Sequence, residues 1–329
     1  MKFLVVGCGS IGQRHIGNLL SLSAGEIIAC DTRQDRLQAV SEKYGLKIYT
    51  DVEQALEQKV NAVLICSPTS LHIPTALSAA ERELHLFIEK PLSHTLEGVD
   101  QLARTTSTRG LTALVGCNMR FFPTIKLVKD LIDEGRIGRV LAAKASWGFY
   151  LPYWHPDDDY RKNYTAISPL GGGIILDNVH ELDFLRWMLG EVKEVSCFLD
   201  KLSNLEMDTE DVAGILLRFE SRALASIHFD CLQPTYRRSC EFIGEEGIIV
   251  ADIIEQRVEL LTREQNQWQV FSENIKTDVN QMYIEEMKHF IDCIEGRDTP
   301  MLDIAGAKRV LQIVLAAKES AETKTAVSI

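Results

Sequence analysis

The sequence lacks the features that mark membrane and secreted proteins. No stretch stays apolar and free of charge for the roughly 18–20 residues that a membrane-spanning helix needs. The apolar run at the N-terminus breaks at Gly7 and reaches Arg14 without the pattern of a signal-peptide cleavage site. There is also no internal repeat and no low-complexity linker. We therefore expect a cytoplasmic protein that has no membrane partner.

An excess of basic residues is also missing. The chain has 35 Lys and Arg against 47 Asp and Glu, which gives a formal net charge of −12. Because this charge repels nucleic acids and anionic membranes at long range, we expect neither as a partner. The balance still allows a locally positive pocket, and so a small anionic substrate.

Cysteine clusters are absent as well. The cysteines occur singly, with no CxxC pair and none of the Cys and His spacing of a zinc site, so we expect no bound metal. Several of them lie inside apolar runs, which predicts free, buried thiols in a reducing compartment. The cysteines are Cys8, Cys30, Cys66, Cys117, Cys197, Cys231, Cys240 and Cys293.

In the first third of the chain, short apolar runs alternate with helix-like segments. The run Lys2–Val6 ends at glycines and suits a strand that is buried on both faces. Strands that alternate with helices of this length indicate βαβ crossovers, and so a doubly wound parallel sheet. The expected strands are 2–6, 26–30, 47–49, 62–66, 84–88 and 112–115, and the expected helices are 10–22, 33–44, 52–58, 73–82 and 96–108.

The alternation stops after about Phe122. Strand-like segments then follow one another with turns between them, which predicts a large, open, mixed or antiparallel sheet in a second, α+β domain. We expect an α/β protein with a dinucleotide-binding domain at 1–122 and a substrate-binding and oligomerisation domain at 123–329. Its C-terminal helices could pack back on the first domain. The strands are expected at 140–149, 192–199, 212–219, 223–230, 239–243 and 257–262, and the helices at 124–134, 280–295 and 304–321.

A glycine-rich loop, Gly7-Cys8-Gly9-Ser10-Ile11-Gly12, joins the first expected strand to the first helix. Its first glycine permits a tight turn, the second lets the backbone approach a pyrophosphate, and the third lets the helix pack on the strand. The start of the helix adds N–H groups that face the anion. Because strand, loop and helix occur in this order, a dinucleotide site explains the loop better than a simple turn does.

Asp31 stands nineteen residues beyond Gly12, at the end of the second expected strand. A carboxylate at this point accepts hydrogen bonds from an adenosine ribose and repels a 2′-phosphate, which favours NAD over NADP. Arg33 weakens that preference, since its guanidinium could accept the phosphate or stack on the adenine.

The order of five motifs resembles the glucose–fructose oxidoreductase, inositol dehydrogenase and rhizopine-catabolism (Gfo/Idh/MocA) family of NAD(P)-dependent oxidoreductases over nearly the whole chain. The resemblance implies a Rossmann domain, followed by an α/β domain whose open sheet carries the contacts of a homodimer or homotetramer. The motifs are the glycine loop, Cys66–His72, Glu89-Lys90-Pro91, Asn118–Phe121, and Gly171–Asp177 running into His180.

The resemblance also implies roles for single residues. It implies a cis peptide bond between Lys90 and Pro91, which an X–Pro bond can adopt at low cost. It places Glu89 on the nicotinamide ribose, although a surface carboxylate is an equally good interpretation. The residues that it adds to the cofactor site are Ser67, Pro68, His72, Glu89 and Asn118.

Lys90 is the first candidate for a catalytic side chain. It follows the fifth expected strand, and ligands of open parallel sheets lie at the carboxyl ends of the strands. Beside a nicotinamide cation, the pKa of a lysine can fall far enough for it to take part in proton transfer or to polarise a substrate oxygen.

His180 and Asp177 are the second pair of catalytic candidates. An imidazole can collect an alcohol proton near neutral pH, and a nearby carboxylate can fix its tautomer. The family usually has four residues from this aspartate to this histidine, and here the interval is three. On one helix the two would still share a face, whereas an aspartate before the helix would be oriented differently. Glu181 occupies the family's histidine interval and could itself contribute.

The segment 150–164 is rich in aromatic and charged residues, which suits a sugar ring with hydroxyl groups or a carboxylate. The same composition also marks oligomer interfaces. Arg120 could pair with a substrate phosphate or carboxylate, or could form a salt link between domains. The expected substrate-binding residues are Arg120, Trp154, His155, Tyr160 and Arg161.

These patterns together predict an oxidoreductase. We expect hydride transfer between NAD(H) and a secondary alcohol of a sugar, nucleotide sugar or cyclitol, with Lys90 and His180 handling the proton. The alternative is a non-catalytic sensor or regulatory protein that binds NAD. The joint presence of Lys90, Asp177 and His180 favours the enzyme, because a sensor needs no proton relay.

Overall fold

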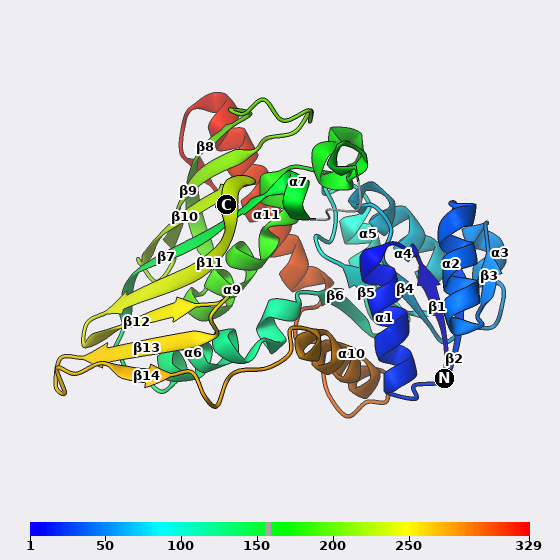
Figure 1. The fold of residues 1–329 in the computed structure, drawn as a ribbon, viewed down its shortest axis with the longest axis horizontal. Coiled ribbons are helices and arrows are strands. Elements are labelled where there is room, and N and C mark those ends of the chain that lie inside the picture. The colour runs from blue at the N-terminus through cyan, green and yellow to red at the C-terminus, as the bar shows by residue number, and fades with distance from the viewer. Residues whose placement is uncertain (155–158) are drawn as a thin grey trace. The chain divides into compact units, whose positions relative to one another are not determined.

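The computed structural model describes residues 1–154 and 159–329 of the chain. These residues form two compact units, one built from Met1–Asn118 and Asn280–Leu311, the other from Met119–Val279 and Gln312–Ile329 (Figure 1). The first division falls at Asn118, close to the predicted boundary at 122. Helix α11 (Ile304–Thr323) contains the second division.

The first unit contains the predicted parallel sheet, with six strands in the order β3-β2-β1-β4-β5-β6. The order reverses between β1 and β4, and in such sheets ligands bind beside this point, at the carboxyl ends of the strands. Every expected strand of this unit is present. The strands are β1 (Lys2–Val6), β2 (Glu26–Cys30), β3 (Lys47–Tyr49), β4 (Ala62–Ile65), β5 (His85–Glu89) and β6 (Ala113–Gly116).

Helices complete the first unit, and one of them comes from late in the chain. In Figure 1, α10 lies beside α1, and its Met287 and Phe290 belong to the same buried cluster as Phe3 and Phe87 of the sheet. Burial of these side chains holds α10 on the sheet. The helices are α1 (Ser10–Ser21), α2 (Gln34–Tyr44), α3 (Val52–Leu56), α4 (His72–Glu81), α5 (Val99–Thr108) and α10 (Asn280–Ile294).

The second unit contains a nine-stranded sheet in the order β14-β13-β12-β11-β7-β10-β9-β8-β15. β7 and β10 pair in parallel and the other pairs are antiparallel, so the sheet is mixed, as predicted. The strands are β7 (Val140–Tyr150), β8 (Val192–Asp200), β9 (Val212–Phe219), β10 (Leu224–Asp230), β11 (Leu232–Gly244), β12 (Gly247–Asp252), β13 (Arg257–Thr262), β14 (Gln269–Phe271) and β15 (Val327–Ser328).

Three strands and half of another were not predicted in this unit. β12, β14 and β15 are short, and β11 begins at Leu232 instead of residue 239. Residues 234–237 are all exposed and a bulge shifts the register between Leu232 and Arg237, so this half of β11 shows no alternation of apolar and polar residues. The helices of the unit are α6 (Pro123–Asp133), α7 (Leu151–Trp154), α8 (Ile174–Asp177) and α9 (Val179–Leu189).

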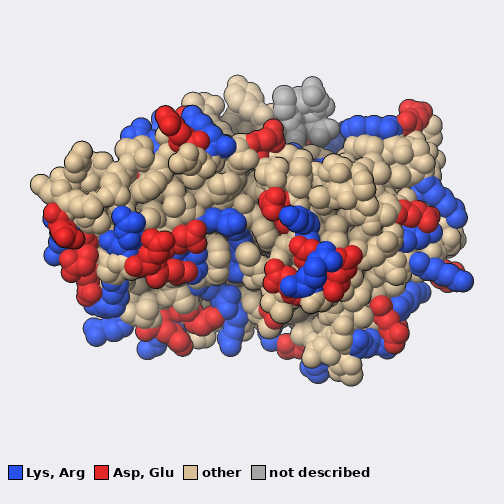
Figure 2. All heavy atoms as spheres, turned by 90° about the horizontal axis from the view of Figure 1, so that it is seen from below, with Lys and Arg blue, Asp and Glu red and all other residues tan. Residues whose placement is uncertain are grey.

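Surface and interior agree with the composition. On the face shown in Figure 2, Lys and Arg lie in small groups among Asp and Glu, with no continuous basic field. All eight cysteines are free and buried, as predicted, and burial raises the pKa of the Cys8 thiol to about 12. Within the described residues, no helix is both long and apolar enough to cross a membrane.

Candidate functional site

The glycine loop adopts the geometry that its sequence predicts. Gly7 has φ +95°, and a Cβ there would lie 2.5 Å from the carbonyl oxygen of Cys66. A Cβ on Gly12 would lie only 1.8 Å from the carbonyl oxygen of Gly7, so both positions require glycine. Gly9 is different, because the nearest atom to its Cβ would be the Arg36 guanidinium at 3.6 Å. This open side of the loop, directly before α1, can accept a phosphate group.

Asp31 lies at the same edge of the sheet, and the structure brings it to the glycine loop. Its carboxylate accepts the Cys8 N–H at 2.7 Å and the Arg33 N–H at 2.8 Å. The Arg33 guanidinium is instead paired with Asp35, and this contact lowers the pKa of Asp35. Arg36, which sequence reasoning missed, lies 3.8 Å from the Asp31 carboxylate. The signal for it was its position one helical turn beyond Arg33 on α2.

The loops after β4 and β6 carry two buried polar atoms that have no hydrogen-bond partner among the described residues. They are Oγ of Ser67 and Oδ1 of Asn118. Both residues follow strands whose carboxyl ends share one edge with the glycine loop. Unpaired polar atoms at such an edge fit a ligand that is rich in hydrogen-bonding groups, such as a dinucleotide.

His72, the third predicted residue after β4, is buried and joins two loops. Its Nδ1 lies 2.8 Å from the carbonyl oxygen of Pro91 and its Nε2 lies 2.9 Å from that of Ser67. Burial lowers the pKa of His72, although both carbonyl groups favour its protonated form. In this position His72 ties the loop after β4 to the loop that carries Lys90 and Pro91.

The Glu89-Lys90-Pro91 motif lies at the carboxyl end of β5. The peptide bond between Lys90 and Pro91 is cis, as expected. Glu89 is buried, and its carboxylate faces His15 of α1, with 2.6 Å between Oε1 and Nε2. The Glu89 carboxylate is therefore not the surface carboxylate that remained open from the sequence. Lys90 itself is half-buried.

In the second unit, Asp177 and His180 do not share a helix. Asp177 ends α8, and Asn178 separates it from α9, which begins at Val179. The Asp177 carboxylate accepts hydrogen bonds from the hydroxyl groups of Tyr164 and Thr165, the latter at 3.1 Å. Asp177 is thus the aspartate before the helix, and its contacts with Tyr164 and Thr165 orient its carboxylate. His180 is buried in the first turn of α9.

Two buried ion pairs hold α9 on either side of its axis. Glu181 accepts two hydrogen bonds from Arg238, at 2.6 and 3.1 Å, and the Arg238 guanidinium lies 4.3 Å from the centre of the Trp147 ring. Burial alone would lower the pKa of Arg238, but Glu181, together with Tyr236, reverses the shift and raises it. Glu181, which the sequence suggested as a further contributor to the catalytic site, is therefore occupied by its contact with Arg238.

Arg120 and Asp183 form the second pair. Two hydrogen bonds of 2.8 Å join the guanidinium to the carboxylate, and both side chains are at most 5 % exposed. The Arg120 guanidinium also lies over the Trp187 ring of α9. Arg120 was a predicted substrate ligand, and its charge is balanced within the second unit by Asp183.

Trp154 lies in a cluster of aromatic side chains. Its ring centre is 4.9 Å from that of Phe149 and 5.3 Å from that of Tyr236, and Trp147 joins the same cluster. Trp154 keeps 38 % of its surface exposed, which leaves part of the ring open to a ligand. His155, another predicted substrate ligand, lies outside the described residues.

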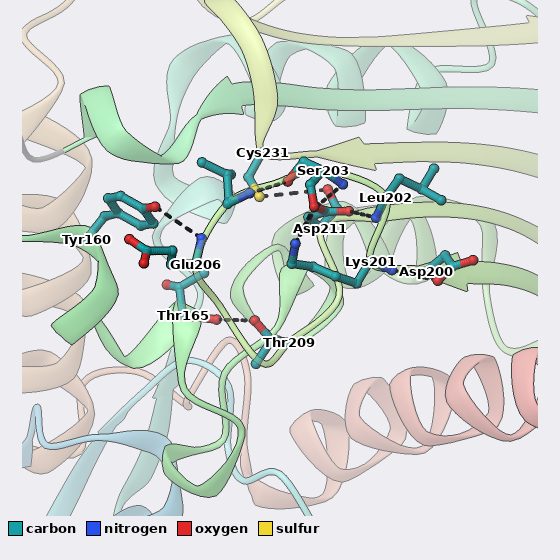
Figure 3. A network of polar contacts seen from close by, with 11 residues as sticks. Tyr160, Thr165, Asp200, Lys201, Leu202, Ser203, Glu206, Thr209, Asp211 and Cys231 are labelled. Atoms are coloured by element: carbon teal, nitrogen blue, oxygen red, sulfur yellow. Dashed lines mark hydrogen bonds and ion pairs between the residues drawn. The ribbon is translucent and has the colours of Figure 1, made fainter.

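Tyr160 and Arg161 both contact Glu206, in the segment 200–211, and Figure 3 shows the Tyr160 contact. The Tyr160 hydroxyl accepts the Glu206 N–H at 3.1 Å. Arg161 is paired with both Asp159 and Glu206. At the base of this segment, the buried Asp211 carboxylate accepts the N–H groups of Leu202 and Ser203. The structure thus places these two predicted residues in a network that joins two loops of the second unit.

Comparison with known proteins gives consistent matches along the chain. A family model described as "Oxidoreductase family, NAD-binding Rossmann fold" matches residues 1–117, and one described as "GFO/IDH/MocA C-terminal domain" matches residues 125–250. The myo-inositol 2-dehydrogenase of Thermotoga maritima is 32 % identical over 344 aligned positions, which cover 100 % of this chain and 98 % of that protein.

Two further proteins extend these matches. The scyllo-inositol 2-dehydrogenase (NAD(+)) of Bacillus subtilis is 28 % identical and is matched over 97 % of this chain and 94 % of its own length. The crystal structure of the WlbA dehydrogenase from Bordetella pertussis, a complex with NADH and UDP-GlcNAcA, superposes with a TM-score of 0.86 at 23 % identity, covering 100 % and 98 % of the two chains. At this level of identity, the similarity to the WlbA dehydrogenase shows only that the two proteins share a fold.

Proposed function

The chain belongs to the GFO/IDH/MocA family of oxidoreductases, and we propose that it oxidises or reduces a secondary alcohol of a sugar or cyclitol with NAD as the hydride carrier. The observation that carries this proposal is the carboxyl edge of the first sheet. The open side of Gly9, the Asp31 carboxylate and Lys90 lie along this edge, as do Ser67 Oγ and Asn118 Oδ1, which have no hydrogen-bond partner among the described residues.

The residues of the first unit fit the cofactor. The N–H groups at the start of α1 would hold the pyrophosphate, and Asp31 would accept the hydroxyl groups of the adenosine ribose. Because the same carboxylate repels a 2′-phosphate, we propose NAD rather than NADP. The pairing of Arg33 with Asp35 supports this choice, since it leaves Arg33 less suited to hold that phosphate.

Bound nicotinamide supplies the carbon that takes up or gives the hydride, and the protein handles the proton. His180 would accept the proton of the substrate hydroxyl group, and Lys90 would polarise the same oxygen. The contacts of Glu181 and Asp183 with Arg238 and Arg120 fix α9, and so the position of His180, before substrate binds. Proximity and orientation of this kind account for a large part of catalysis in cofactor enzymes.

A polyhydroxylated ring is the substrate class that the second unit supports best. The partly exposed Trp154 offers an aromatic face on which a sugar ring can stack. Arg120 and Arg161 are already paired with carboxylates, so hydroxyl groups are favoured over a charged group as the feature recognised. The relatives named for inositol support a sugar or cyclitol, and a nucleotide sugar remains within the class.

We also propose that the protein assembles as a homodimer or homotetramer through the open face of the nine-stranded sheet. Three apolar side chains lie on the same face of the sheet according to the strand register: Phe198 of β8, Leu216 of β9 and Leu224 of β10. Phe198 is 88 % exposed and Leu216 is 60 % exposed. Apolar side chains gathered on one open face are typical of protein contacts.

The test of the proposed chemistry follows NADH absorbance while a panel of cyclitols, sugars, sugar acids and nucleotide sugars is added. On the substrate that reacts, Lys90→Met and His180→Ala should each lower kcat by about 10²- to 10⁴-fold, the usual contribution of a positioned acid or base. Both variants should still bind NAD. Normal turnover in both variants would refute the assigned roles, and the absence of any NAD binding would refute the proposed function as a whole.

A further inference from the structure

A buried histidine that the proposed chemistry does not use lies beside the Lys90 motif. His15, in the second turn of α1, is fully buried, and its Nε2 lies 2.6 Å from Oε1 of Glu89. The edge of its ring packs on Phe87, two residues before Glu89 on β5, with 4.9 Å between the ring centres. His15 therefore contacts the carboxyl-terminal half of β5, the strand that leads into Lys90.

The second oxygen of the same carboxylate contacts the lysine. Glu89 Oε2 accepts the backbone N–H of Lys90 at 3.2 Å, so the carboxylate is held between the imidazole of His15 and the main chain of Lys90. Only 10 % of the Glu89 side chain is exposed. A carboxylate this buried needs a donor on each oxygen, and these two groups supply them.

The hydrogen bonds of His15 show which group it serves. A carboxylate oxygen accepts hydrogen bonds, so an N–H at Nε2 would donate to Oε1 of Glu89. Nδ1 is buried and has no hydrogen-bond partner among the described residues. If the ring served only for packing, an apolar side chain would fill the same space without burying an unpaired nitrogen. Packing alone therefore does not explain a histidine at this position. Among the described residues, the contact with Glu89 is the one hydrogen bond of His15 and explains why a histidine stands here.

Helix α10 closes this group of charges from the other side. The Tyr283 ring lies 6.1 Å from that of His15, centre to centre, and the Arg14 guanidinium lies 4.6 Å above the Tyr283 ring. Burial raises the pKa of Tyr283; the charges of Glu89 and Glu286 raise it further, and those of Arg14 and Lys90 lower it. The His15–Glu89 contact is therefore enclosed by aromatic rings and is shielded from water.

From this geometry we propose that His15 is a positioning residue for Lys90. It holds the Glu89 carboxylate against the Lys90 backbone N–H, which fixes the start of the loop from which the lysine side chain projects. Without the imidazole, Oε1 would lose its buried donor, and the carboxylate would no longer be held in place against β5. This inference deepens the proposed function and rests on the role that we assign there to Lys90.

The test compares three histidine variants in the full-length protein. His15→Leu removes the donor, and His15→Gln keeps an N–H that can reach the same oxygen. His85→Gln is the matched control, because His85 begins the same strand, β5, at its opposite end, where it accepts the Thr112 N–H. kcat, KM and the Kd for NADH are measured for each, with myo-inositol as the first substrate and then the remaining panel.

We expect kcat to fall about tenfold to a hundredfold in His15→Leu, because small misplacements of a reacting group have effects of this size. The Kd for NADH should change less than about threefold, in keeping with a fold that is intact. His15→Gln should recover most of kcat, and His85→Gln should match the wild type. Equal losses in His15→Leu and His15→Gln, or a kcat unchanged in His15→Leu, would overturn the inference.

Hydrogen exchange supplies a readout that does not depend on turnover. In the cofactor-free protein, exchange at the Lys90 amide, followed by mass spectrometry, should be at least about tenfold faster in His15→Leu than in His85→Gln, because its acceptor is no longer held. Adding Glu89→Gln to His15→Leu should give little further change, since both act through one carboxylate. Unchanged exchange at Lys90 in His15→Leu would count against the positioning role.

The two proposals can fail separately. If Lys90→Met keeps full turnover, the proposed role of the lysine fails, whatever the His15 variants do. If Lys90→Met loses turnover while His15→Leu keeps both kcat and slow exchange at Lys90, the proposed function stands and this inference alone is wrong.

Discussion

The loops at the edge of the first sheet and helix α9 of the second unit differ in how their polar side chains are bonded. At the edge of the first sheet, Ser67 Oγ and Asn118 Oδ1 are buried and have no hydrogen-bond partner within the part of the chain that the structure describes, and the loop at Gly9 leaves room beside them on the same edge. Around His180 in the second unit, the neighbouring carboxylates of Glu181 and Asp183 are each bound by two hydrogen bonds to an arginine.

This difference indicates two kinds of functional surface. The first unit has polar groups whose partners a ligand must supply, so ligand binding should stabilise it. In the second unit, arginines bind the carboxylates of Glu181 and Asp183 on α9, which holds the helix in one position, although Asn178 before the helix keeps buried polar atoms without a partner among the described residues. A change at the first edge should therefore affect cofactor binding and leave folding intact, whereas a change at the second should affect folding first.

The largest effect is expected when one partner of a buried ion pair in the second unit is removed. Asp183→Ala leaves the Arg120 guanidinium buried without its carboxylate, which should lower the free energy of unfolding by about 3–5 kcal/mol. Urea unfolding followed by tryptophan fluorescence measures this directly, because all four tryptophans, Trp147, Trp154, Trp187 and Trp268, lie in the second unit.

The control for this prediction is an ion pair in the same unit that is more exposed. Lys144 and Glu241 lie on paired strands, 2.9 Å apart, with the lysine side chain 63 % exposed. Glu241→Gln should change the free energy of unfolding by no more than about 1 kcal/mol. If Asp183→Ala has an effect no larger than this, the buried pairs do not hold α9.

The strands of the first unit could be predicted from the sequence more completely than those of the second unit. In the first unit every strand was predicted, because each is a short apolar run bounded by glycine or polar residues and its neighbours are set by local crossovers. In the second unit β12 was missed, although Ile248, Ile249 and Val250 lie within it, since pairing with β11 and β13 defines it more than its own pattern does. Sheets built from distant pairs are specified by partners that a local pattern does not show.

The candidate site divides in the same way. Gly7, Gly12 and Asp31 were predicted because their roles depend on backbone geometry within one βαβ unit. The partner of Arg120 lies 63 residues away and that of Glu181 lies 57 residues away, so no spacing rule could indicate them. His15 was missed for a related reason, since its contact with Glu89 spans 74 residues.

A second prediction concerns Asp31, at the carboxyl edge of the first sheet. Asp31→Asn removes the charge that accepts the ribose hydroxyl groups, and it should weaken NAD binding about tenfold, or about 1.4 kcal/mol. NADP should lose less affinity than NAD, because the repulsion of its 2′-phosphate is relieved. Kd values from NADH and NADPH fluorescence titrations measure both effects. Glu26→Gln is the control, since this exposed carboxylate is paired with Lys2 and begins β2, at the end of the strand opposite to Asp31.

The smallest expected effect on stability concerns the open face of the nine-stranded sheet. Phe198→Gln replaces a side chain that is 88 % exposed, so the free energy of unfolding should change by no more than about 0.5 kcal/mol. Association should nevertheless weaken, because an apolar contact would be lost from each copy. Sedimentation velocity over a range of concentrations should show a smaller species for this variant. Leu202→Gln, 65 % exposed but outside the sheet face, should sediment like the wild type. If Phe198→Gln also sediments like the wild type, the open face of the sheet is not the oligomer contact.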